Sequence, residues 1–528
     1  MITTAEIVDR LESVPSIDRL LELGCRRHAD KAFIRWRGET TTYAEFDADV
    51  ARVAGALTGL GVREGDRVAV MMTNSPDWLA LWFAVVRTGA VLVPINTAHK
   101  SAGLRYQLED CRPSVLVLDP GFVIHLDVTQ LEHRPRHVLT AVPRSTTPPV
   151  VATGLGPHSP AAILYTSGTT GPPKGCLLPH GQYVAASFLH ADACGYDEST
   201  VIYTCLPLFH INAQNYTVLS ALAAGGTVAL DDRFSASQFW DRLTEVGATA
   251  FNFIGSMAAS LWNQPERESE RQHGARVGFG VPLAPEIWES WEKRFGVRVV
   301  YTYGMTENAL PAIVDSRETP VPAARRGSSG QASPTSEIAV VDEHDRPLGA
   351  GEIGQILTRA RIPWTMTTEY VGRPDATAEA FRNHWFHTGD LGYLDADGYL
   401  FFVDRLKDAV RRRGEMVSSW EVETVVAQYP GVSECAMVGV SSELGDDDIL
   451  VVLVTDDPGF DPARLVAFCG ERLAHFQVPR YVRRVEELPK TQTQRVEKYR
   501  LRHEGLLAGD WDAGVPRRAR EVHEAPTH

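Results

Sequence analysis

A glycine-rich stretch directly follows a predicted strand in the first half of the chain. Residues 161–165 are apolar and predict the strand, and the sequence from Tyr165 to Gly175 reads YTSGTTGPPKG. Glycine permits positive φ and small side chains leave backbone N–H groups uncovered, so consecutive amides can point into one concavity. Lys174 adds a positive charge. The stretch therefore predicts a loop that binds a polyphosphate.

The predicted loop is not the P-loop with the pattern G-x-x-x-x-G-K-[ST]. Lys174 is followed by Gly175 and Cys176, so no hydroxyl stands next to the lysine to hold Mg2+. A different nucleotide-binding fold is therefore needed. A plain surface loop is the alternative, since such loops are often rich in glycine, serine and threonine, but few of them end in Pro-Pro-Lys-Gly after an apolar strand.

Length and composition bound the class of protein. With 528 residues the chain exceeds what one hydrophobic core usually supports, so we expect two or more domains. The formal net charge of −15 argues against a surface that binds nucleic acid, and local basic groups must hold any anionic ligand. The seven cysteines form no C-x-x-C pair, which favours reduced thiols over disulfides or a zinc site.

Two further features bear on location. The first ten residues are polar and include acidic side chains, unlike a signal peptide. The longest apolar run, residues 78–86, is far shorter than the roughly 20 residues that span a bilayer. We therefore expect a cytoplasmic protein without a membrane span.

Predicted strands alternate with predicted helices over the first part of the chain. Thr42 and Glu45 have the spacing of a capping box at the start of one helix. Alternation of this kind implies a parallel sheet with crossover helices. Helices are expected at residues 4–30, 42–60, 76–87 and 104–111, and strands at 66–72, 90–95, 114–118, 201–205, 250–254 and 277–281.

A second motif lies at the end of a predicted strand and reads VVYTYGMTE from Val299 to Glu307. Tyr303 offers a ring for stacking on adenine, Thr306 a hydroxyl for the α-phosphate, and Glu307 a carboxylate oxygen for Mg2+. A plain turn is the alternative. Together with the polyphosphate loop, these residue types favour a nucleotide site.

The two motifs resemble the signatures of the adenylate-forming (ANL) superfamily, which includes acyl-CoA synthetases, luciferases and the adenylation domains of peptide synthetases. The resemblance covers nearly the whole chain, and residues 94–97 and 493–495 are more specifically similar to ligases of the crotonobetaine/carnitine type. It implies an α/β fold: a large N-terminal domain of mixed and parallel sheets covered by helices, with a small β-barrel-like subdomain, and a small mobile α+β C-terminal domain.

The resemblance places an AMP-binding domain at residues 1–404 and the mobile domain at 405–508. Residues 509–528 mix charges with proline and glycine, so we expect them to be disordered. Lys407 stands where the family has its hinge. The basic run 411–413 beside Gly414 suits the phosphates of coenzyme A, although a solvated basic face is an equal alternative for the individual arginines.

Further roles follow from the same resemblance. Gly280, Val281 and Pro282 would flank the adenine, with Val281 where the family usually has alanine. Asp390 would accept both ribose hydroxyls, for which a carboxylate has the lone pairs, and Arg405 would contact ribose and phosphate. The residues expected to bind ATP or coenzyme A are Thr166, Ser167, Gly168, Thr169, Thr170, Gly171, Gly280, Val281, Pro282, Tyr301, Thr302, Tyr303, Gly304, Met305, Asp390, Arg405, Arg411 and Gly414.

The acid is expected in a pocket whose mixture of apolar and amide groups suits a short or aromatic acid better than a long unbranched chain. In this pocket His210 is expected to be a wall rather than an acid–base group. The pocket residues are His210, Asn212, Asn252, Phe253, Ile254 and Ala309. The expected catalytic residues are Lys174, Thr306, Glu307, Lys407 and Arg495, with Glu307 as the metal ligand.

Arg495 is the main departure from the family pattern. Family members usually have Gly-Lys where this chain has Gln494-Arg495, and the lysine bridges the substrate carboxylate and the phosphates. Arginine keeps the charge but spreads it over a planar fork. Three alternatives remain open: Arg495 does the same work, Lys498 or Lys490 reaches the site instead, or adenylation is weak or repurposed.

The expected activity is that of an ATP-dependent acyl-CoA ligase, with ATP, Mg2+ and coenzyme A, acting on a small carboxylic acid. An enzyme that passes its adenylate to a carrier protein or another nucleophile, or that activates a small oxyanion such as nitrite, is the alternative. A non-catalytic nucleotide-binding protein is a third possibility, and retention of Lys174, Thr306, Glu307, Asp390 and Arg405 argues against it. The sequence leaves both a monomer and a homodimer open.

Overall fold

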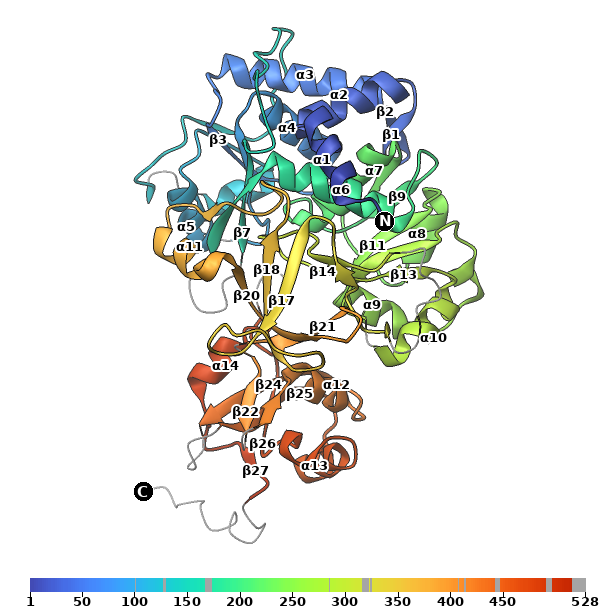
Figure 1. The fold of residues 1–528 in the computed structure, drawn as a ribbon, viewed down its shortest axis with the longest axis vertical. Coiled ribbons are helices and arrows are strands. Elements are labelled where there is room, and N and C mark those ends of the chain that lie inside the picture. Colours follow the sequence, from blue (N-terminus) through green and yellow to red (C-terminus); the bar gives the residue numbers. More distant parts are fainter. Residues whose placement is uncertain are drawn as a thin grey trace.

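The computed structural model describes residues 1–99, 101–126, 130–166, 173–283, 285–315, 322, 325–406, 408–412, 415–441, 447–490 and 496–514. A large α/β unit lies at the top of Figure 1, a smaller α+β unit lies at the bottom, and small antiparallel sheets connect them. The predicted fold class is confirmed. The division at residue 404 stays a prediction.

One seven-stranded sheet carries the ends of the polyphosphate loop. Its strand order is β19-β8-β7-β4-β3-β5-β6, with β7, β4, β3, β5 and β6 parallel to one another and β8 antiparallel to β7. The loop therefore joins the two strands of a hairpin, and its residues 167–172 lie outside the described part. The strands are β3 (Arg67–Met71), β4 (Val91–Pro94), β5 (Val115–Leu118), β6 (His137–Leu139), β7 (Pro160–Thr166), β8 (Lys174–Pro179) and β19 (Glu369–Tyr370).

A second seven-stranded sheet has the order β13-β12-β11-β9-β10-β1-β2, and all neighbours except β1 and β2 are parallel. The carboxyl ends of β11 and β12 therefore lie together at one edge, as the sequence predicts. The strands are β1 (Ala32–Trp36), β2 (Glu39–Thr42), β9 (Val201–Thr204), β10 (Thr227–Leu230), β11 (Ala250–Ile254), β12 (Val277–Val281) and β13 (Arg298–Val300).

One hydrophobic core spans both sheets and includes two helices that are buried almost all round, α4 and α6. The predicted capping box is present, since Thr42 and Glu45 bond each other's backbone N–H at the start of α3. The helices are α1 (Thr4–Ser13), α2 (Ile17–His28), α3 (Tyr43–Gly59), α4 (Pro76–Arg87), α5 (Ser101–Cys111), α6 (His180–Cys194), α7 (Ser220–Ala224), α8 (Phe239–Glu245), α9 (Gly255–Trp262) and α10 (Pro285–Phe295), with a π-helix η3 (Asn212–Leu219) and 3-10 turns η1 (Pro120–His125) and η4 (Glu268–Arg271).

Two small antiparallel sheets occupy the place of the expected β-barrel-like subdomain. One has the order β14-β15-β16 and the other β17-β18-β20-β21. Their elements are β14 (Thr302–Tyr303), β15 (Ala312–Ile313), β16 (Gln331–Ala332), β17 (Ser336–Val341), β18 (Gly354–Ala360), α11 (Pro374–Ala380), η6 (Arg382–His384), β20 (Phe386–Leu394) and β21 (Leu400–Arg405).

The C-terminal unit is a four-stranded sheet, β24-β25-β26-β27, with helices on both faces. Residues of α12 and α13 share one apolar cluster with the sheet, and Leu501 of α14 belongs to a cluster on the other face. A two-stranded sheet, β22-β23, precedes it. The elements are β22 (Val410–Arg412), β23 (Glu415–Val417), α12 (Ser419–Val426), β24 (Val432–Ser441), β25 (Asp447–Thr455), α13 (Pro462–Gly470), η7 (His475–Gln477), β26 (Tyr481–Val485), α14 (Lys498–Glu504) and β27 (Trp511–Asp512).

The prediction of a disordered tail from residue 509 is wrong for its first residues. Trp511 and Asp512 form β27, which pairs with β26. A buried ion pair between Arg483 and Asp510, 2.7 Å long, holds this segment against the sheet. Residues 515–528 lie outside the described part.

The described residues contain neither a membrane-spanning helix nor a disulfide. No helix among them is long and apolar enough to cross a membrane. All seven cysteines are described, and each is a free thiol.

Candidate active site

The predicted nucleotide-binding residues lie at or beside the ends of strands from different sheets. Thr166 ends β7 and Lys174 begins β8, while Tyr303 ends β14. Asp390 of β20 is paired in register with Arg405, the last residue of β21. The fold therefore brings together side chains from four distant parts of the chain.

Tyr370 contacts both Lys174 and Glu307. Its hydroxyl donates a hydrogen bond to Glu307 Oε1 at 2.8 Å, and Lys174 Nζ lies 4.9 Å from the centroid of its ring. The backbone N–H of Thr367 donates to the Glu307 carbonyl at 2.7 Å, which anchors the motif to the segment before β19. Both Tyr370 and Glu307 are only 8% exposed, so their charges and dipoles act in a partly water-excluded site.

Asp390 is the acid at the centre of a second group. It is buried, and its Oδ2 accepts a hydrogen bond from the Tyr303 hydroxyl at 2.6 Å. Arg405 Nη1 lies 2.8 Å from Oδ1, but Oδ1 has no hydrogen-bond partner of good geometry among the described residues. Its lone pairs can therefore accept another donor, as the expected ribose contact requires.

The two groups are electrostatically connected. Burial raises the pKa of Asp390, the Arg405 guanidinium opposes this rise, and the negative charge of Glu307 adds to it. Burial disfavours the charged form of Arg405, but Asp390, Glu307 and other acidic groups outweigh it and raise the pKa of this side chain. Lys174, Tyr370, Glu307, Asp390 and Arg405 therefore form one cluster of facing charges.

Close backbone packing shapes the expected adenine side. A Cβ on Gly280 would lie 2.2 Å from the Phe253 carbonyl oxygen, and a Cβ on Gly304 would lie 2.1 Å from the Ala309 carbonyl oxygen, so glycine is required at both positions. The Val281–Pro282 peptide bond is cis.

Polar groups beside the expected adenine site form hydrogen bonds within the protein. The Thr302 hydroxyl donates to the Ala312 carbonyl at 2.7 Å, and Met305 N–H donates to the Asn308 carbonyl at 3.0 Å. Tyr301 packs on Trp288 with ring centroids 5.0 Å apart.

The structure brings part of the predicted acyl pocket together. Asn252 Nδ2 donates to Asn212 Oδ1 at 3.2 Å and to Thr217 Oγ1 at 2.9 Å, which joins β11 to the π-helix η3. The Tyr216 hydroxyl of the same helix donates to the Ala309 carbonyl. π-helical turns occur frequently at functional sites, which favours a functional reading of η3.

The remaining pocket candidates differ in placement. His210 and Ile254 are exposed. Phe253 is fully buried and packs against Trp291, with ring centroids 5.5 Å apart. Because successive strand residues point to opposite faces, Phe253 lies away from Asn252 and Asn212, and the structure does not bring it to their cluster.

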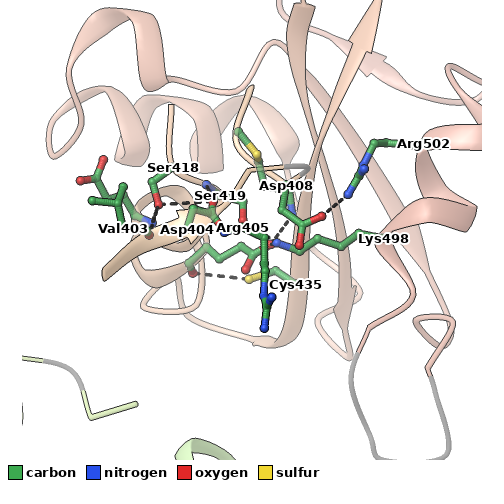
Figure 2. A network of polar contacts seen from close by, with 12 residues as sticks. Val403, Asp404, Arg405, Asp408, Ser418, Ser419, Cys435, Lys498 and Arg502 are labelled. Atoms are coloured by element: carbon green, nitrogen blue, oxygen red, sulfur yellow. Dashed lines mark hydrogen bonds and ion pairs between the residues drawn. The ribbon is translucent and has the colours of Figure 1, made fainter. Parts of the chain in front are cut away.

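Contacts near the predicted hinge join the two units (Figure 2). The Ser419 N–H at the start of α12 donates to Asp404 Oδ2 at 2.5 Å, and the Ser418 hydroxyl donates to the Val403 carbonyl at 3.1 Å. Beyond the hinge, Arg502 of α14 forms an ion pair with Asp408. Lys407, the predicted hinge residue, lies outside the described residues, as do Gly414 and Arg495, and the side chain of Arg411 in β22 is likewise not described.

Both lysines considered as substitutes for Arg495 are engaged within the C-terminal unit. Lys498 Nζ lies 2.8 Å from Glu423 Oε1 and donates to the Ser419 hydroxyl at 2.6 Å, while Lys490 pairs with Glu434. Arg412 forms a buried ion pair with Asp448, 3.0 Å long, so it has a structural function in this arrangement.

Sequence reasoning missed two residues that support the site. Tyr370 stands outside every recognised motif, and only the fold brings it to Lys174 and Glu307. Gln182 is buried in α6, and its Nε2 donates to the Thr306 carbonyl at 2.9 Å. No local pattern indicates either contact, because both join segments far apart in the sequence.

The side chains present suit Mg2+ and a nucleotide. One oxygen of Glu307 is held by Tyr370, so the carboxylate keeps lone pairs for a hard cation. Asp390 Oδ1, which has no hydrogen-bond partner of good geometry among the described residues, offers an acceptor for a hydroxyl. Lys174 and Arg405 offer positive charge for phosphates. Such an arrangement can stabilise charge that develops on phosphoryl oxygens.

Comparisons with known proteins identify the family. A family model described as AMP-binding enzyme matches residues 21–370, and one described as AMP-binding enzyme C-terminal domain matches residues 421–495. A crotonobetaine/carnitine–CoA ligase of Salmonella paratyphi B is 32% identical over 482 residues, which cover 87% of this chain and 93% of the relative.

Solved structures of similar fold include the o-succinylbenzoate CoA synthetase MenE from Bacillus subtilis in complex with its acyl-adenylate intermediate. That structure has a TM-score of 0.82 and 26% sequence identity, covering 92% of this chain and 98% of the other. The same enzyme in complex with ATP and magnesium ion has a TM-score of 0.81 and 25% identity, covering 91% and 98%.

Proposed function

Because the chain belongs to the family of AMP-binding enzymes, and so to the adenylate-forming superfamily that its motifs resemble, we propose that it is an ATP-dependent acyl-CoA ligase. The observation that carries the proposal is the cluster of Lys174, Glu307 and Asp390, linked through Tyr370 and Arg405. Its substrates are ATP, a small carboxylic acid and coenzyme A.

In the first step, a carboxylate oxygen of the acid attacks the α-phosphorus of ATP. The new P–O bond forms as the bond to pyrophosphate breaks, which gives an acyl-adenylate. Lys174 and Arg405 offset negative charge on the phosphates, Arg495 is proposed to do so from the C-terminal unit, and Asp390 holds the ribose. Mg2+, when bound, would neutralise further phosphate charge, and Glu307 is the residue proposed to hold it. The protein supplies no covalent nucleophile.

In the second step, the thiol of coenzyme A attacks the acyl carbonyl, its proton is lost to solvent, and AMP leaves. A rotation of the C-terminal unit about Lys407 is proposed to remove Arg495 and bring residues 411–415 to the site. Such a rotation must break the bonds that Asp404 and Val403 form with α12, because these residues lie on opposite sides of the hinge. The ion pair of Arg502 and Asp408 lies on one side and can persist.

The amides of Asn212 and Asn252 favour a short or aromatic acid over a long unbranched chain. A panel of such acids should include crotonobetaine and carnitine, after the name of the relative in Salmonella. Release of AMP and pyrophosphate is then measured for each acid with and without coenzyme A.

We expect acid-dependent pyrophosphate release and, with coenzyme A, formation of a thioester. Glu307→Gln is the control for background hydrolysis. Acid-dependent pyrophosphate release that never yields a thioester would instead support an enzyme that passes its adenylate to a carrier protein or another nucleophile.

A further inference from the structure

Lys174 and Glu307 carry opposite charges and contact different parts of one tyrosine, Tyr370. The Lys174 ammonium lies over the ring of Tyr370, and Glu307 accepts a hydrogen bond from its hydroxyl. In the part of the chain that the structure describes, each of these two residues contacts Tyr370, and they form no ion pair with each other. Tyr370 is therefore in contact with both charged groups.

This separation matters for the proposed chemistry. Opposite charges in a partly buried site attract far more strongly than in water. Because Tyr370 contacts both charged groups, we expect Lys174 and Glu307 to be drawn toward each other where its ring is absent. A direct pair would engage the ammonium needed for the phosphates and the carboxylate needed for the metal. A ring face holds a cation more loosely than a carboxylate does, so phosphate can take the lysine from it.

Tyr370 is itself held firmly. It ends β19 and lies in register with Cys176 of β8, the strand that begins at Lys174. Its backbone N–H also bonds the Thr377 hydroxyl of α11 at 3.0 Å. The Cys176 thiol is buried, and burial together with the charge of Glu307 raises its pKa. Two neighbouring strands therefore hold Tyr370 beside Lys174, and the Thr367 N–H anchors the Glu307 backbone to the segment before β19.

We propose that Tyr370 is a positioning residue of the active site, which orients the Glu307 carboxylate for the metal through its hydroxyl and keeps the Lys174 ammonium free for phosphate through its ring. This inference rests on the proposed function. Its two halves concern different atoms of one side chain, so they can be tested separately.

Tyr370→Phe removes the hydroxyl and keeps the ring. Binding of a fluorescent ATP analogue is measured in EDTA and over a series of Mg2+ concentrations, with neither acid nor coenzyme A present. We expect unchanged binding in EDTA and about a tenfold higher Mg2+ concentration at half-saturation, since the lost bond is one to a charged group. Tyr203→Phe is the matched control, because Tyr203 is buried and its hydroxyl bonds the Asp231 carboxylate at 3.1 Å in the other large sheet.

Tyr370→Leu removes the ring as well. The ammonium of Lys174 is then expected to pair with Glu307, which weakens binding of the analogue in EDTA by about tenfold or more. Adding Glu307→Gln to this variant should restore binding in EDTA to the level of Glu307→Gln alone, because the competing charge is gone. A purely structural loss would not be rescued by a substitution at a second residue.

The outcomes separate the two proposals. If the unaltered protein binds no nucleotide, the proposed function fails and the inference with it. If it binds nucleotide but Tyr370→Phe leaves the Mg2+ dependence at the level of Tyr203→Phe, or Glu307→Gln fails to rescue Tyr370→Leu, the inference is overturned while the proposed function stands. If Tyr370→Leu does not fold, Tyr370→Phe still decides the half of the proposal that concerns the hydroxyl and Glu307.

Discussion

Replacing Asp390 by asparagine tests the nucleotide site through a change of charge at almost constant shape. In the structure the carboxylate accepts a hydrogen bond from Tyr303 at 2.6 Å and faces Arg405 at 2.8 Å. Asparagine keeps one oxygen for the Tyr303 hydroxyl. It removes the negative charge and the free acceptor at Oδ1, which the account assigns to the ribose.

The expected loss of affinity follows from the bond that disappears. A hydrogen bond to a charged group contributes about 1.5–3 kcal/mol, so ATP binding should weaken by roughly 10- to 100-fold. The stability of the folded protein, by contrast, should not fall in this variant. Burial raises the pKa of Asp390 above 3.8, so its stabilising protonated form is present below that pH and is lost as the pH rises through the raised pKa. At pH 7 the buried charge costs stability and asparagine removes this cost, while the Arg405 guanidinium, whose side chain is 42% exposed, can be solvated in place of its lost partner.

The assay combines calorimetric titration with a non-hydrolysable ATP analogue and thermal melting, both at pH 7. Asp397→Asn is the matched control, since this aspartate lies in the hairpin between β20 and β21 and its side chain is 70% exposed. We expect weak nucleotide binding and an undiminished melting temperature for Asp390→Asn, with no change for the control. Equal ATP affinity in the two variants would refute the assignment of Asp390.

Three further predictions concern other parts of the molecule. Burial lowers the pKa of His190 to about 3, so below pH 6.5 the unfolded chain binds a proton on this histidine that the folded chain does not bind. The free energy of unfolding should therefore fall by about 2 kcal/mol between pH 7 and pH 5. In urea unfolding, His190→Gln should show a smaller fall between these pH values, and an equal fall would contradict the prediction. Lys407→Pro should keep acid-dependent pyrophosphate release but lose thioester formation, and equal loss of both would count against rotation at this hinge. Arg495→Lys should change the rate of pyrophosphate release by less than tenfold if Arg495 does the work of the usual lysine, whereas a large rise would mean that the arginine impairs adenylation.

Much of the fold was predictable because local chemistry and tertiary packing agree there. The helix from Pro76 to Arg87 coincides with its predicted bounds, since a serine cap and a proline mark its start and an apolar run fills the core. The capping box of Thr42 and Glu45 forms as expected. The strand ends near Thr166 and Val281 were also predictable, since short apolar runs stop there.

Other features depend on contacts that no local pattern encodes. The strand from Lys174 to Pro179 exists because it pairs with β7, and its own sequence begins with a charge and a glycine. Tyr370 enters the site only because β19 pairs with β8. The first residues of the predicted tail are ordered by Arg483, which lies on a strand about thirty positions earlier. The catalytic assignments of Lys407 and Arg495 stay predictions, since both residues lie outside the described part of the chain.

The most direct test of the account is a crystal structure of the protein with Mg2+ and a non-hydrolysable ATP analogue. We predict that the phosphates lie against Lys174, the metal against Glu307, and the ribose against Asp390, with the α-phosphorus open to the side of Asn212. A nucleotide bound elsewhere, or one that contacts only one of these three residues, would contradict it.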